Sequence, residues 1–369
     1  MSAPGTESAQ VSTIVEEDPV LFRVDRGVGR ITLNRPRQIN AFDHRMVKLV
    51  EPVLAEWAED PEVRFLIIDG AGERGFCAGG DVKAIYSDAK SGGRGAIDYW
   101  RDEYHVDAAV ARFPKPVLTL MDGIVMGGGV GLAGHASHRV VTERSMVGMP
   151  ETGIGLIPDV GGTYLLGRTP GQLGLHVGLT GGRMTAGDAI ALGFADHFVP
   201  SDKLPDLIEK ATTHGIPAAL AEFVEPAPES ELLAEREWID RCYSAPTAVD
   251  IVAALQDAPE PAAAKAATAI SRVSPTSVTV TLRAIRAMRA AGGTLEQALN
   301  LEFGLCSHAL DTPDLAEGIR AQVVDKDRNP QWTPATLAEV GNVDAWFAPP
   351  ATELPFPDAP PVPTDMLEK

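Results

Sequence analysis

Apolar residues follow two different periods along the chain, and these periods predict its elements. Residues 20–25 and 28–34 alternate apolar and polar positions on either side of an Arg26-Gly27 turn signal, which predicts a β-hairpin. Buried strands are expected where apolar residues run together, at 63–69, 116–121, 139–142 and 195–199. Helical spacing predicts helices at 43–59, 97–112, 163–179 and 186–192. Strands that alternate with helices indicate an α/β domain.

Pro52 lies inside the first predicted helix. Asp43 is expected to cap the start of that helix, because its side chain can accept a hydrogen bond from a free backbone N–H. A proline removes one helical hydrogen bond and clashes with the preceding turn. We therefore expect a kink or a break at Pro52.

The composition changes after residue 200. With 369 residues, the chain is longer than one hydrophobic core usually organises. Ala, Glu and Pro dominate the next seventy or so residues, and helices are predicted at 230–243, 275–291 and 295–310. We divide the chain into a mobile N-terminal tail, an α/β core with the site, a helical insertion, C-terminal helices and a proline-rich tail, at 1–18, 19–200, 201–270, 271–348 and 349–369.

Charge and cysteine content exclude several classes of partner. The formal net charge is -19, and both nucleic acid and an anionic membrane require a basic surface, so neither is expected as a partner. Cys77, Cys242 and Cys306 lack metal-ligand or redox spacing, which suggests a reducing compartment without disulfides. No signal-like segment and no apolar run of membrane-spanning length is present. We therefore expect a cytoplasmic protein.

Two buried strands each lead into a glycine-rich loop, which suggests one site between the loops. The first loop reads GAGERGFCAGGD and the second DGIVMGGGVGLAG. Glycines allow backbone N–H groups to approach a ligand, and at a helix start those groups are unpaired. The N–H groups of Ala78 and of Gly128, which opens a short helix running to Ala136, could together hold an oxygen that gains negative charge. The alternative is that both loops are only tight connections.

The run MPETGIGLIPDVGG places Glu151 and Asp159 in apolar surroundings. Burying an unpaired carboxylate is costly, so each must be solvated, paired or useful. Two such groups among glycines point to a site. The alternative is that Glu151 caps a helix and Asp159 opens a turn.

Other patterns are weaker. Residues 129–134 match a dinucleotide-binding fingerprint, but the helix after them is short and the preceding strand ends too early. His135 and His138 could share a helical face, without an apparent third metal ligand. Cys77 is expected to be a small apolar filler. Glu103 lies on a helix that looks exposed, so a solvated or paired charge is its default interpretation.

Together, FCAGGD, MGGGVG and PETGIGLIPDVGG resemble the crotonase (enoyl-CoA hydratase/isomerase) superfamily, most of all its 3-hydroxyisobutyryl-CoA hydrolases. RITLNRP, INAF, RDEY, SPTS and EGIRAQVVDKDRNPQW extend the resemblance over nearly the whole chain. It implies an α/β fold of the crotonase-like (ClpP/crotonase) type, a ββα spiral core with a C-terminal helical region. It also implies hydrolysis of an acyl-CoA thioester, without a metal or redox cofactor, since coenzyme A is part of the substrate.

The resemblance implies a role for each candidate residue. The N–H groups of Ala78 and Gly128 would form an oxyanion hole for the thioester carbonyl. Glu151 would be the catalytic carboxylate, acting either as a base or as a nucleophile. Asp159 would bind the substrate hydroxyl and help to place Glu151, and Glu103 would contact the substrate.

One position separates the possible reactions. Hydratases of this superfamily carry a second catalytic glutamate two residues after the triple glycine, and this chain has Gly131 there. Addition of water to a double bond needs both an acid and a base, so the missing carboxylate favours hydrolysis. The alternatives are an enoyl-CoA hydratase or isomerase, a CoA-binding module without turnover and a nicotinamide-dependent oxidoreductase.

Coenzyme A is anionic, so this acidic chain must supply basic groups locally. Arg35, Arg37, Arg74 and Lys83 border the loops, and we select Arg35 and Lys83 as CoA-binding residues. Members of the superfamily commonly form trimers or hexamers. The insertion after residue 200 and the long C-terminal end could block such packing, so a homo-oligomer stays an open possibility.

Overall fold

The computed structural model describes residues 18–348, 354 and 356. The predicted N-terminal tail, apart from Asp18, and most of the proline-rich tail therefore lie outside the described residues. Within the described part, ten strands are divided between two sheets. The strands are β1 (Val20–Asp25), β2 (Val28–Leu33), β3 (Phe65–Gly70), β4 (Gly75–Cys77), β5 (Val117–Met121), β6 (Ile124–Met126), β7 (His138–Val141), β8 (Met146–Gly148), β9 (Arg183–Met184) and β10 (His197–Phe198).

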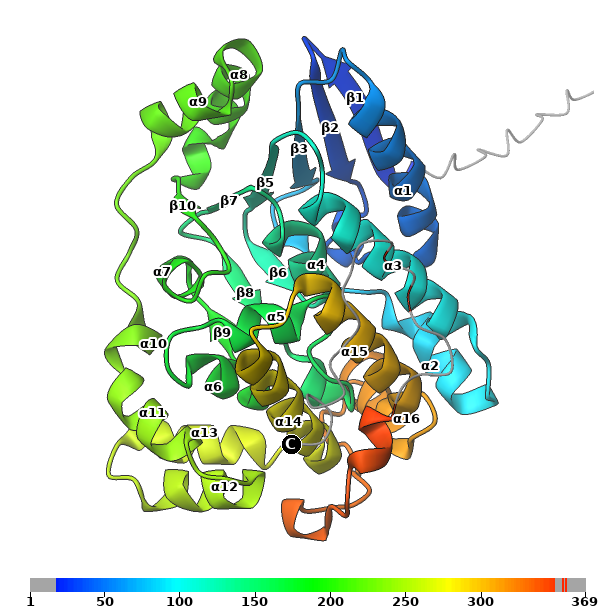
Figure 1. Ribbon diagram of the computed structural model, residues 1–369, viewed down its shortest axis with the longest axis vertical. Coiled ribbons are helices and arrows are strands. Elements are labelled where there is room, and N and C mark those ends of the chain that lie inside the picture. The colour runs from blue at the N-terminus through cyan, green and yellow to red at the C-terminus, as the bar shows by residue number, and fades with distance from the viewer. Residues whose placement is uncertain (1–17, 349–353, 355, 357–369) are drawn as a thin grey trace, which may run out of the picture.

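From β3 to β8 successive strands enter alternate sheets, so this part of the chain winds as a spiral (Figure 1). The six-stranded sheet has the order β1-β2-β3-β5-β7-β10, with the β1–β2 hairpin antiparallel and the other neighbours parallel. The four-stranded sheet has the order β4-β6-β8-β9, and only β9 runs antiparallel to its neighbour. The predicted hairpin and the predicted α/β spiral are confirmed.

Helices follow the paired strands, and a long helical region completes the chain (Figure 1). None of the helices in the described ranges is both long and apolar enough to cross a lipid bilayer. The α-helices are α1 (His44–Glu59), α2 (Val82–Ser91), α3 (Gly95–Ala111), α4 (Gly128–Gly134), α5 (Gly162–Gly167), α6 (Leu173–Thr180), α7 (Ala186–Ala191), α8 (Leu204–His214), α9 (Ile216–Phe223), α10 (Glu231–Ala234), α11 (Arg236–Tyr243), α12 (Ala248–Asp257), α13 (Pro261–Ile270), α14 (Pro275–Ala291), α15 (Leu295–Ala309) and α16 (Pro313–Ile319). The shorter helical turns are η1 (Pro36–Gln38), η2 (Glu151–Ile154), η3 (Ser201–Lys203), η4 (Arg320–Val324), η5 (Leu337–Glu339) and η6 (Asp344–Phe347).

Three of the predicted helices continue or divide differently from the prediction. The break expected at Pro52 is absent, because α1 continues through it. The side chain of Pro52 is exposed, so water can reach the carbonyl that loses its partner in the preceding turn. The single helix predicted at 163–179 is instead α5 and α6, with Pro170 between them. The helix predicted at 230–243 is also divided, into α10 and α11.

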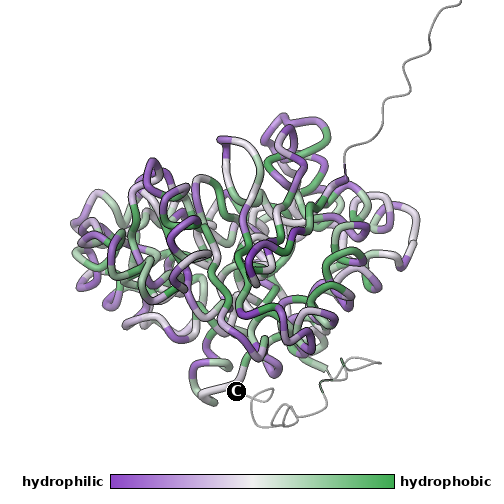
Figure 2. Tube along the Cα trace, turned by 90° about the horizontal axis from the view of Figure 1, so that it is seen from above, coloured by the Kyte–Doolittle hydropathy of each residue, from purple (hydrophilic) through white to green (hydrophobic). Residues whose placement is uncertain are grey.

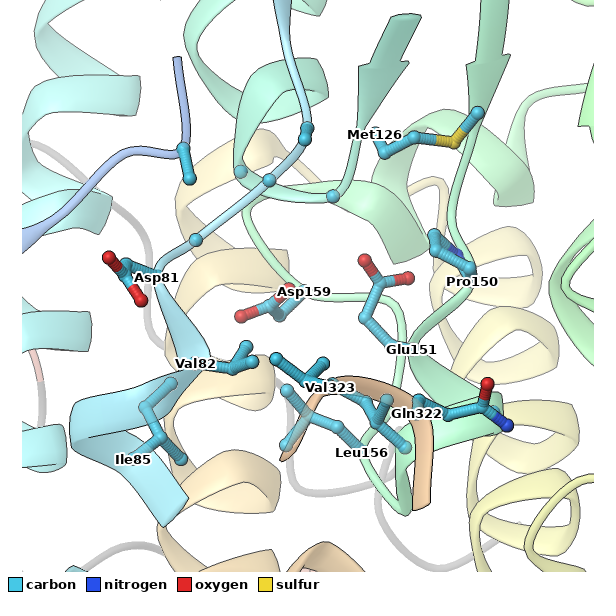
Figure 3. A pocket seen from close by; sticks show the side chains of 18 of the residues that line it. Asp81, Val82, Ile85, Met126, Pro150, Glu151, Leu156, Asp159, Gln322 and Val323 are labelled. Atoms are coloured by element: carbon cyan, nitrogen blue, oxygen red, sulfur yellow. The ribbon is translucent and has the colours of Figure 1, made fainter. Parts of the chain in front are cut away.

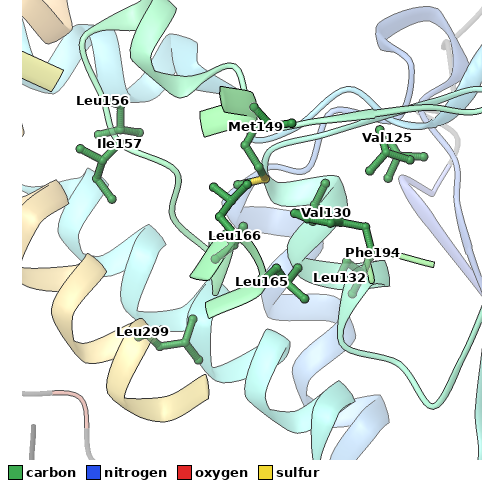
Figure 4. Packing of buried hydrophobic residues seen from close by; sticks show 14 of the residues in the cluster. Val125, Val130, Leu132, Met149, Leu156, Ile157, Leu165, Leu166, Phe194 and Leu299 are labelled. Atoms are coloured by element: carbon green, nitrogen blue, oxygen red, sulfur yellow. The ribbon is translucent and has the colours of Figure 1, made fainter. Parts of the chain in front are cut away.

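Both faces of the six-stranded sheet are covered, as parallel sheets require. Leu66 and Ile68 of β3 point into the main core, whereas Phe65 and Ile67 point into a second apolar cluster under α8 and α9. Figure 4 shows how the main core joins α4 and α5 to α15, through side chains such as Val130, Leu165 and Leu299. Figure 2 shows hydrophobic segments inside the molecule and hydrophilic segments on its outer loops.

The C-terminal helix α16 packs directly on the short turn η2. A Cβ atom placed on Gly318 would lie 2.4 Å from the carbonyl carbon of Ile154. A Cβ atom on Gly155 would lie 2.3 Å from the carbonyl oxygen of Asp314. The two backbones meet without intervening side chains, so α16 sets the position of η2, which begins with Glu151.

We expect Gly318→Ala to lower the free energy of unfolding by about 1–3 kcal/mol, because the added methyl group must displace the Ile154 backbone. Urea unfolding measures this loss. Gly341→Ala is the matched control, since nothing lies within 4 Å of a Cβ atom there, and it should change stability by less than about 0.5 kcal/mol. Equal effects of the two substitutions would contradict the close packing of α16 on η2.

Candidate active site

A cavity of about 530 Å³ lies between the two glycine loops. Its walls come from α2, α3, the start of α4, η2 and the C-terminal turn η4. The structure thus brings together six of the predicted site residues: Ala78, Lys83, Glu103, Gly128, Glu151 and Asp159. Figure 3 shows Glu151 and Asp159 reaching into this space, close to the apolar side chains of Val82, Leu156 and Val323.

The start of α4 must be built from glycine. Gly127 has φ 49° and ψ -119°, a backbone conformation that other residues avoid. A Cβ atom on Gly127 would lie 2.6 Å from Oε1 of Glu151, and one on Gly128 would lie 2.5 Å from Oε1 of Glu103. Two carboxyl groups therefore approach this backbone at distances that leave no room for side chains.

The free N–H groups differ in part from the sequence-based expectation. Gly128 is the first residue of α4, where an N–H has no partner within the helix. The N–H of Ala78 is not free, because it donates to the carbonyl oxygen of Ile39 at 2.9 Å. Ile39 has φ 51°, a left-handed conformation that the sequence did not reveal. In the described part of the chain the Gly80 N–H donates to no acceptor, and its nitrogen lies 3.2 Å from the Cβ position of Gly128.

Glu151 is held in the cavity wall as the first residue of η2. Its side chain is buried, and its Oε2 has no hydrogen-bond partner among the described residues. Burial raises the pKa of Glu151 well above its usual range, and the negative charge of Asp159 raises it further. One carboxyl oxygen of Glu151, Oε2, is thus unpaired, and the other, Oε1, lies close to the backbone of Gly127 just before α4.

Asp159 is buried between α3 and α15. The Tyr104 hydroxyl donates to its Oδ2 at 2.9 Å, and the Cys306 thiol lies 3.9 Å from the same oxygen. Burial raises the pKa of Asp159 to about 6, although the Tyr104 hydrogen bond acts in the opposite direction. Asp159 is therefore mostly ionised at neutral pH and takes up a proton as the pH falls toward 6.

Glu103 is buried, which corrects the expectation of an exposed charge. The hydrophobic pattern of α3 wrongly suggested an exposed helix. In the structure this helix is covered on several sides, by α1, α2, α4 and α15. The Tyr99 hydroxyl lies 2.9 Å both from Oε1 of Glu103 and from the carbonyl oxygen of Phe42. Tyr99 has one proton to donate, so a protonated Glu103 allows both bonds to form. Burial raises the pKa of Glu103 well above its usual range, in agreement with that arrangement.

The predicted CoA-binding residues lie in different surroundings. Arg35 forms ion pairs with Asp43 at 3.0 Å and Asp81 at 3.1 Å and lies outside the cavity wall, so it supports the loop instead. Lys83 is exposed at the cavity and has no ion-pair partner in the ranges that the structure describes. Arg328, which sequence reasoning missed, also lines the cavity.

The π-helical turn η4 brings the C-terminal segment into the cavity wall. It supplies Gln322 and Val323, and Arg328 follows it with φ 56°. Arg328 donates to Oε1 of Gln322 at 3.3 Å, whereas Arg320 takes the nearby carboxylates of Glu317, Asp325 and Asp327. Nothing in the sequence spacing connected this segment to glycine loops so far away in the chain.

The weaker sequence candidates have structural roles. His135 ends α4 and bonds to the Val160 carbonyl, while His138 begins β7, so the two do not share a helical face. Cys77 is buried, and burial raises the pKa of its thiol to about 12. Within the described residues, no group of three or more His, Cys, Asp or Glu side chains could hold a metal ion.

Comparison with known proteins places this geometry in a family. The family model described as enoyl-CoA hydratase/isomerase matches residues 28–347. A relative from Gallus gallus, named 3-hydroxyisobutyryl-CoA hydrolase, mitochondrial, is 40% identical over 343 residues, which cover 89% of this chain and 89% of the relative.

Two solved structures are also similar. A protein from Mycobacterium thermoresistibile, described as a carnitinyl-CoA dehydratase, has a TM-score of 0.89 and 49% identity, covering 92% of this chain and 99% of that chain. A protein from Rhodobacter sphaeroides 2.4.1, described as an enoyl-CoA hydratase, has a TM-score of 0.85 and 43% identity, covering 90% of this chain and 98% of that chain. Both structures resemble this chain over most of its length, which supports the same fold.

The predicted cytoplasmic location is corrected by the relative from Gallus gallus, whose name places that protein in mitochondria. The prediction rested on reduced cysteines and on the absence of a recognisable signal, which do not separate one reducing compartment from another. The extent of the sequence and structure matches settles the classification independently of location. This chain belongs to the enoyl-CoA hydratase/isomerase family.

Proposed function

We propose that this protein hydrolyses the thioester of 3-hydroxyisobutyryl-CoA to 3-hydroxyisobutyrate and coenzyme A, a step of valine breakdown. The observation that carries the proposal is the buried carboxyl group of Glu151, whose Oε2 is unpaired and whose Oε1 approaches the glycine backbone just before α4. The name of the Gallus gallus relative supports the substrate. No metal or redox cofactor enters the proposed reaction.

The proposed chemistry begins at the thioester carbonyl. Its oxygen would accept hydrogen bonds from the N–H groups of Gly128 and Gly80, which would stabilise the negative charge that develops there. Gly80 takes the place that we first assigned to Ala78, whose N–H is occupied. This pair of donors would form the oxyanion hole of the enzyme.

Glu151 would bring water to the carbonyl carbon by one of two routes. As a base, it takes a proton from water while the oxygen adds to the carbon, and the proton then passes to the departing thiolate. As a nucleophile, it displaces the thiolate to form an anhydride, which water opens in a second step. In both routes the carbon–sulfur bond breaks, and a carbon–oxygen bond to water oxygen replaces it.

Gly131 explains why hydrolysis is favoured over hydration. A Cβ atom there would lie 2.6 Å from Cβ of Val160 and 2.8 Å from Oδ2 of Asp107. No side chain fits at this position, so a second catalytic carboxylate cannot come from it. The descriptions of the two similar solved structures make enoyl-CoA hydration the second candidate, and the first experiment below separates the two reactions.

Asp159 and Glu103 would recognise the acyl group. An ionised Asp159 can accept a hydrogen bond from the hydroxyl of a 3-hydroxyacyl group, and Tyr104 holds its carboxylate in place. Glu103 would contact the substrate from α3, beside Gly128. Both groups are buried, so their hydrogen bonds to substrate would not compete with bulk water.

Lys83 and Arg328 would bind the phosphates of coenzyme A. They are exposed cations at the same cavity, contributed by α2 and by the segment after η4. In the described ranges neither has a carboxylate partner, in contrast to Arg35 and Arg320. In a protein with a net charge of -19, two unpaired cations at the cavity are the natural site for an anion.

We expect Glu151→Gln to lower kcat by at least about 100-fold, because the amide can act neither as a base nor as a nucleophile. Release of free thiol from 3-hydroxyisobutyryl-CoA measures the reaction. The exposed Glu62 provides a control, since Glu62→Gln should keep wild-type activity. Crotonyl-CoA tests the alternative: loss of its enoyl absorbance without thiol release from either substrate would identify a hydratase.

We expect Tyr104→Phe to move the acidic limb of the kcat/KM profile to higher pH by about one unit. The Tyr104 bond favours the ionised form of Asp159, so its loss raises the pKa of Asp159 above the present value of about 6. The activity that needs ionised Asp159 is then lost at a higher pH as the solution is acidified. Tyr164→Phe removes a hydroxyl outside the cavity and should leave the limb in place. An unmoved limb in Tyr104→Phe would disprove the role given to Asp159.

We expect Arg328→Gln to raise KM for the CoA thioester about tenfold, which is roughly 1.4 kcal/mol of binding free energy. The N-acetylcysteamine thioester of the same acid has no phosphate, so its KM should not change. Arg37→Gln, an exposed arginine outside the cavity wall, is the control. An equal rise in KM for both thioesters would show that Arg328 shapes the loop and does not bind phosphate.

A further inference from the structure

Asp107 is a buried carboxyl group that the proposed reaction does not use. It lies on α3 one turn after Glu103 and is only 1% exposed. Neither of its oxygens has a hydrogen-bond partner among the residues that the structure describes. Such a group costs stability, so its presence calls for an explanation beyond packing.

The carboxyl group of Asp107 lies directly behind the cavity wall. It packs against the backbone of α4, where a Cβ atom on Gly131 would meet its oxygens at 2.8 and 2.9 Å. The same Cβ position is 2.6 Å from Cβ of Val160, the residue that follows Asp159 and lines the cavity. Asp107 thus contacts the wall from behind and is not among the residues that line the cavity.

The charged groups that face Asp107 are all carboxyl groups. They are Glu103 on its own helix, Asp159 in the cavity wall and Glu302 on α15, and all three raise its pKa. The helix α4 offers only Gly, Val, Leu and Ala. The cations that α1 directs at α3 bind Asp102 instead: Lys48 Nζ and His44 Nε2 each lie 2.6 Å from its Oδ2.

Glu302 shows what a structural carboxylate looks like in the same cluster. It accepts the backbone N–H groups of Gly161 at 2.7 Å and Thr163 at 2.8 Å, and so holds the loop after Asp159. Asp107 accepts no hydrogen bond from any described residue. Burial and three carboxyl neighbours both favour its protonated form, and raise its pKa well above the usual range.

We propose that Asp107 is a positioning residue of the active site, a carboxylic acid that stays neutral during turnover and whose charge state limits the negative charge that Glu103, Glu151 and Asp159 can carry. The catalytic part of this inference rests on the proposed hydrolysis. While Asp107 is neutral, it adds no repulsion to an ionised Glu151 or to the oxyanion of the substrate. Once it ionises as the pH rises, both face an additional buried negative charge, and turnover falls.

The first experiment needs no substrate. Asp107→Asn keeps the shape of the side chain and cannot ionise. Unfolded aspartate loses its proton near pH 3.9, whereas folded Asp107 retains it to a higher pH, so the wild-type protein loses stability as pH rises through this interval. The variant should therefore melt above the wild type, with a gap that is absent near pH 4 and grows to about 2 °C or more by pH 8.

The control for stability is Asp188→Asn. Asp188 is also buried, but it accepts hydrogen bonds from Thr185 and Ser230, so its substitution should lower the melting temperature. If Asp107→Asn also melts below the wild type, by the same amount at every pH, Asp107 is an ordinary structural aspartate and the proposal is wrong.

The second experiment follows the pH profile of thiol release. Asp107→Asn should move the alkaline limb of kcat to higher pH by at least one unit and leave the acidic limb, which reports Glu151 and Asp159, where it is. An alkaline limb identical to that of the wild type would overturn the positioning role. If the wild-type protein releases no thiol at all, the proposed function and the positioning role fail together, and the melting comparison still decides whether Asp107 is neutral.

Discussion

The close approach of carboxyl side chains to a glycine backbone is the constraint on which the rest of this structure depends. Glu151, Glu103 and Asp107 each lie within 3 Å of the place where a Cβ atom would stand on Gly127, Gly128 or Gly131. The same glycines leave the first N–H of α4 uncovered. A larger residue at these positions would fill the cavity and push the acids away, so the backbone and the acids form one unit.

The outer elements hold the glycine backbone and the acids in place. Glu302, on α15, binds two N–H groups in the loop that begins after Asp159, and α16 packs its Gly318 on the backbone of η2. The C-terminal helices are therefore part of the site and not an appendage. Segments that are far apart in the chain, near residues 80, 103, 128, 151 and 323, therefore form the wall of one cavity.

Charge is distributed unevenly between the interior and the mouth of the cavity. Inside, five carboxyl groups influence one another, and no cation is among the groups that shift their pKa values: Glu103, Asp107, Glu151, Asp159 and Glu302. At the mouth, Lys83 and Arg328 are exposed. The site is thus suited to an anionic carrier outside and a hydrogen-bonding acyl group inside. Protonation of the buried acids lowers the free-energy cost of burying them.

By itself the sequence determined most of the elements, because periodicity and turn signals act over a few residues. The hairpin, the strands before the glycine loops and the acids of the PETGIGLIPDVGG run were all visible in this way. Only the tertiary structure decided that Glu103 is buried, that the Ala78 N–H is occupied by Ile39 and that Arg328 reaches the cavity. Each of these depends on contacts between residues far apart in the chain, and burial, free donors and unpaired charges are properties of those contacts.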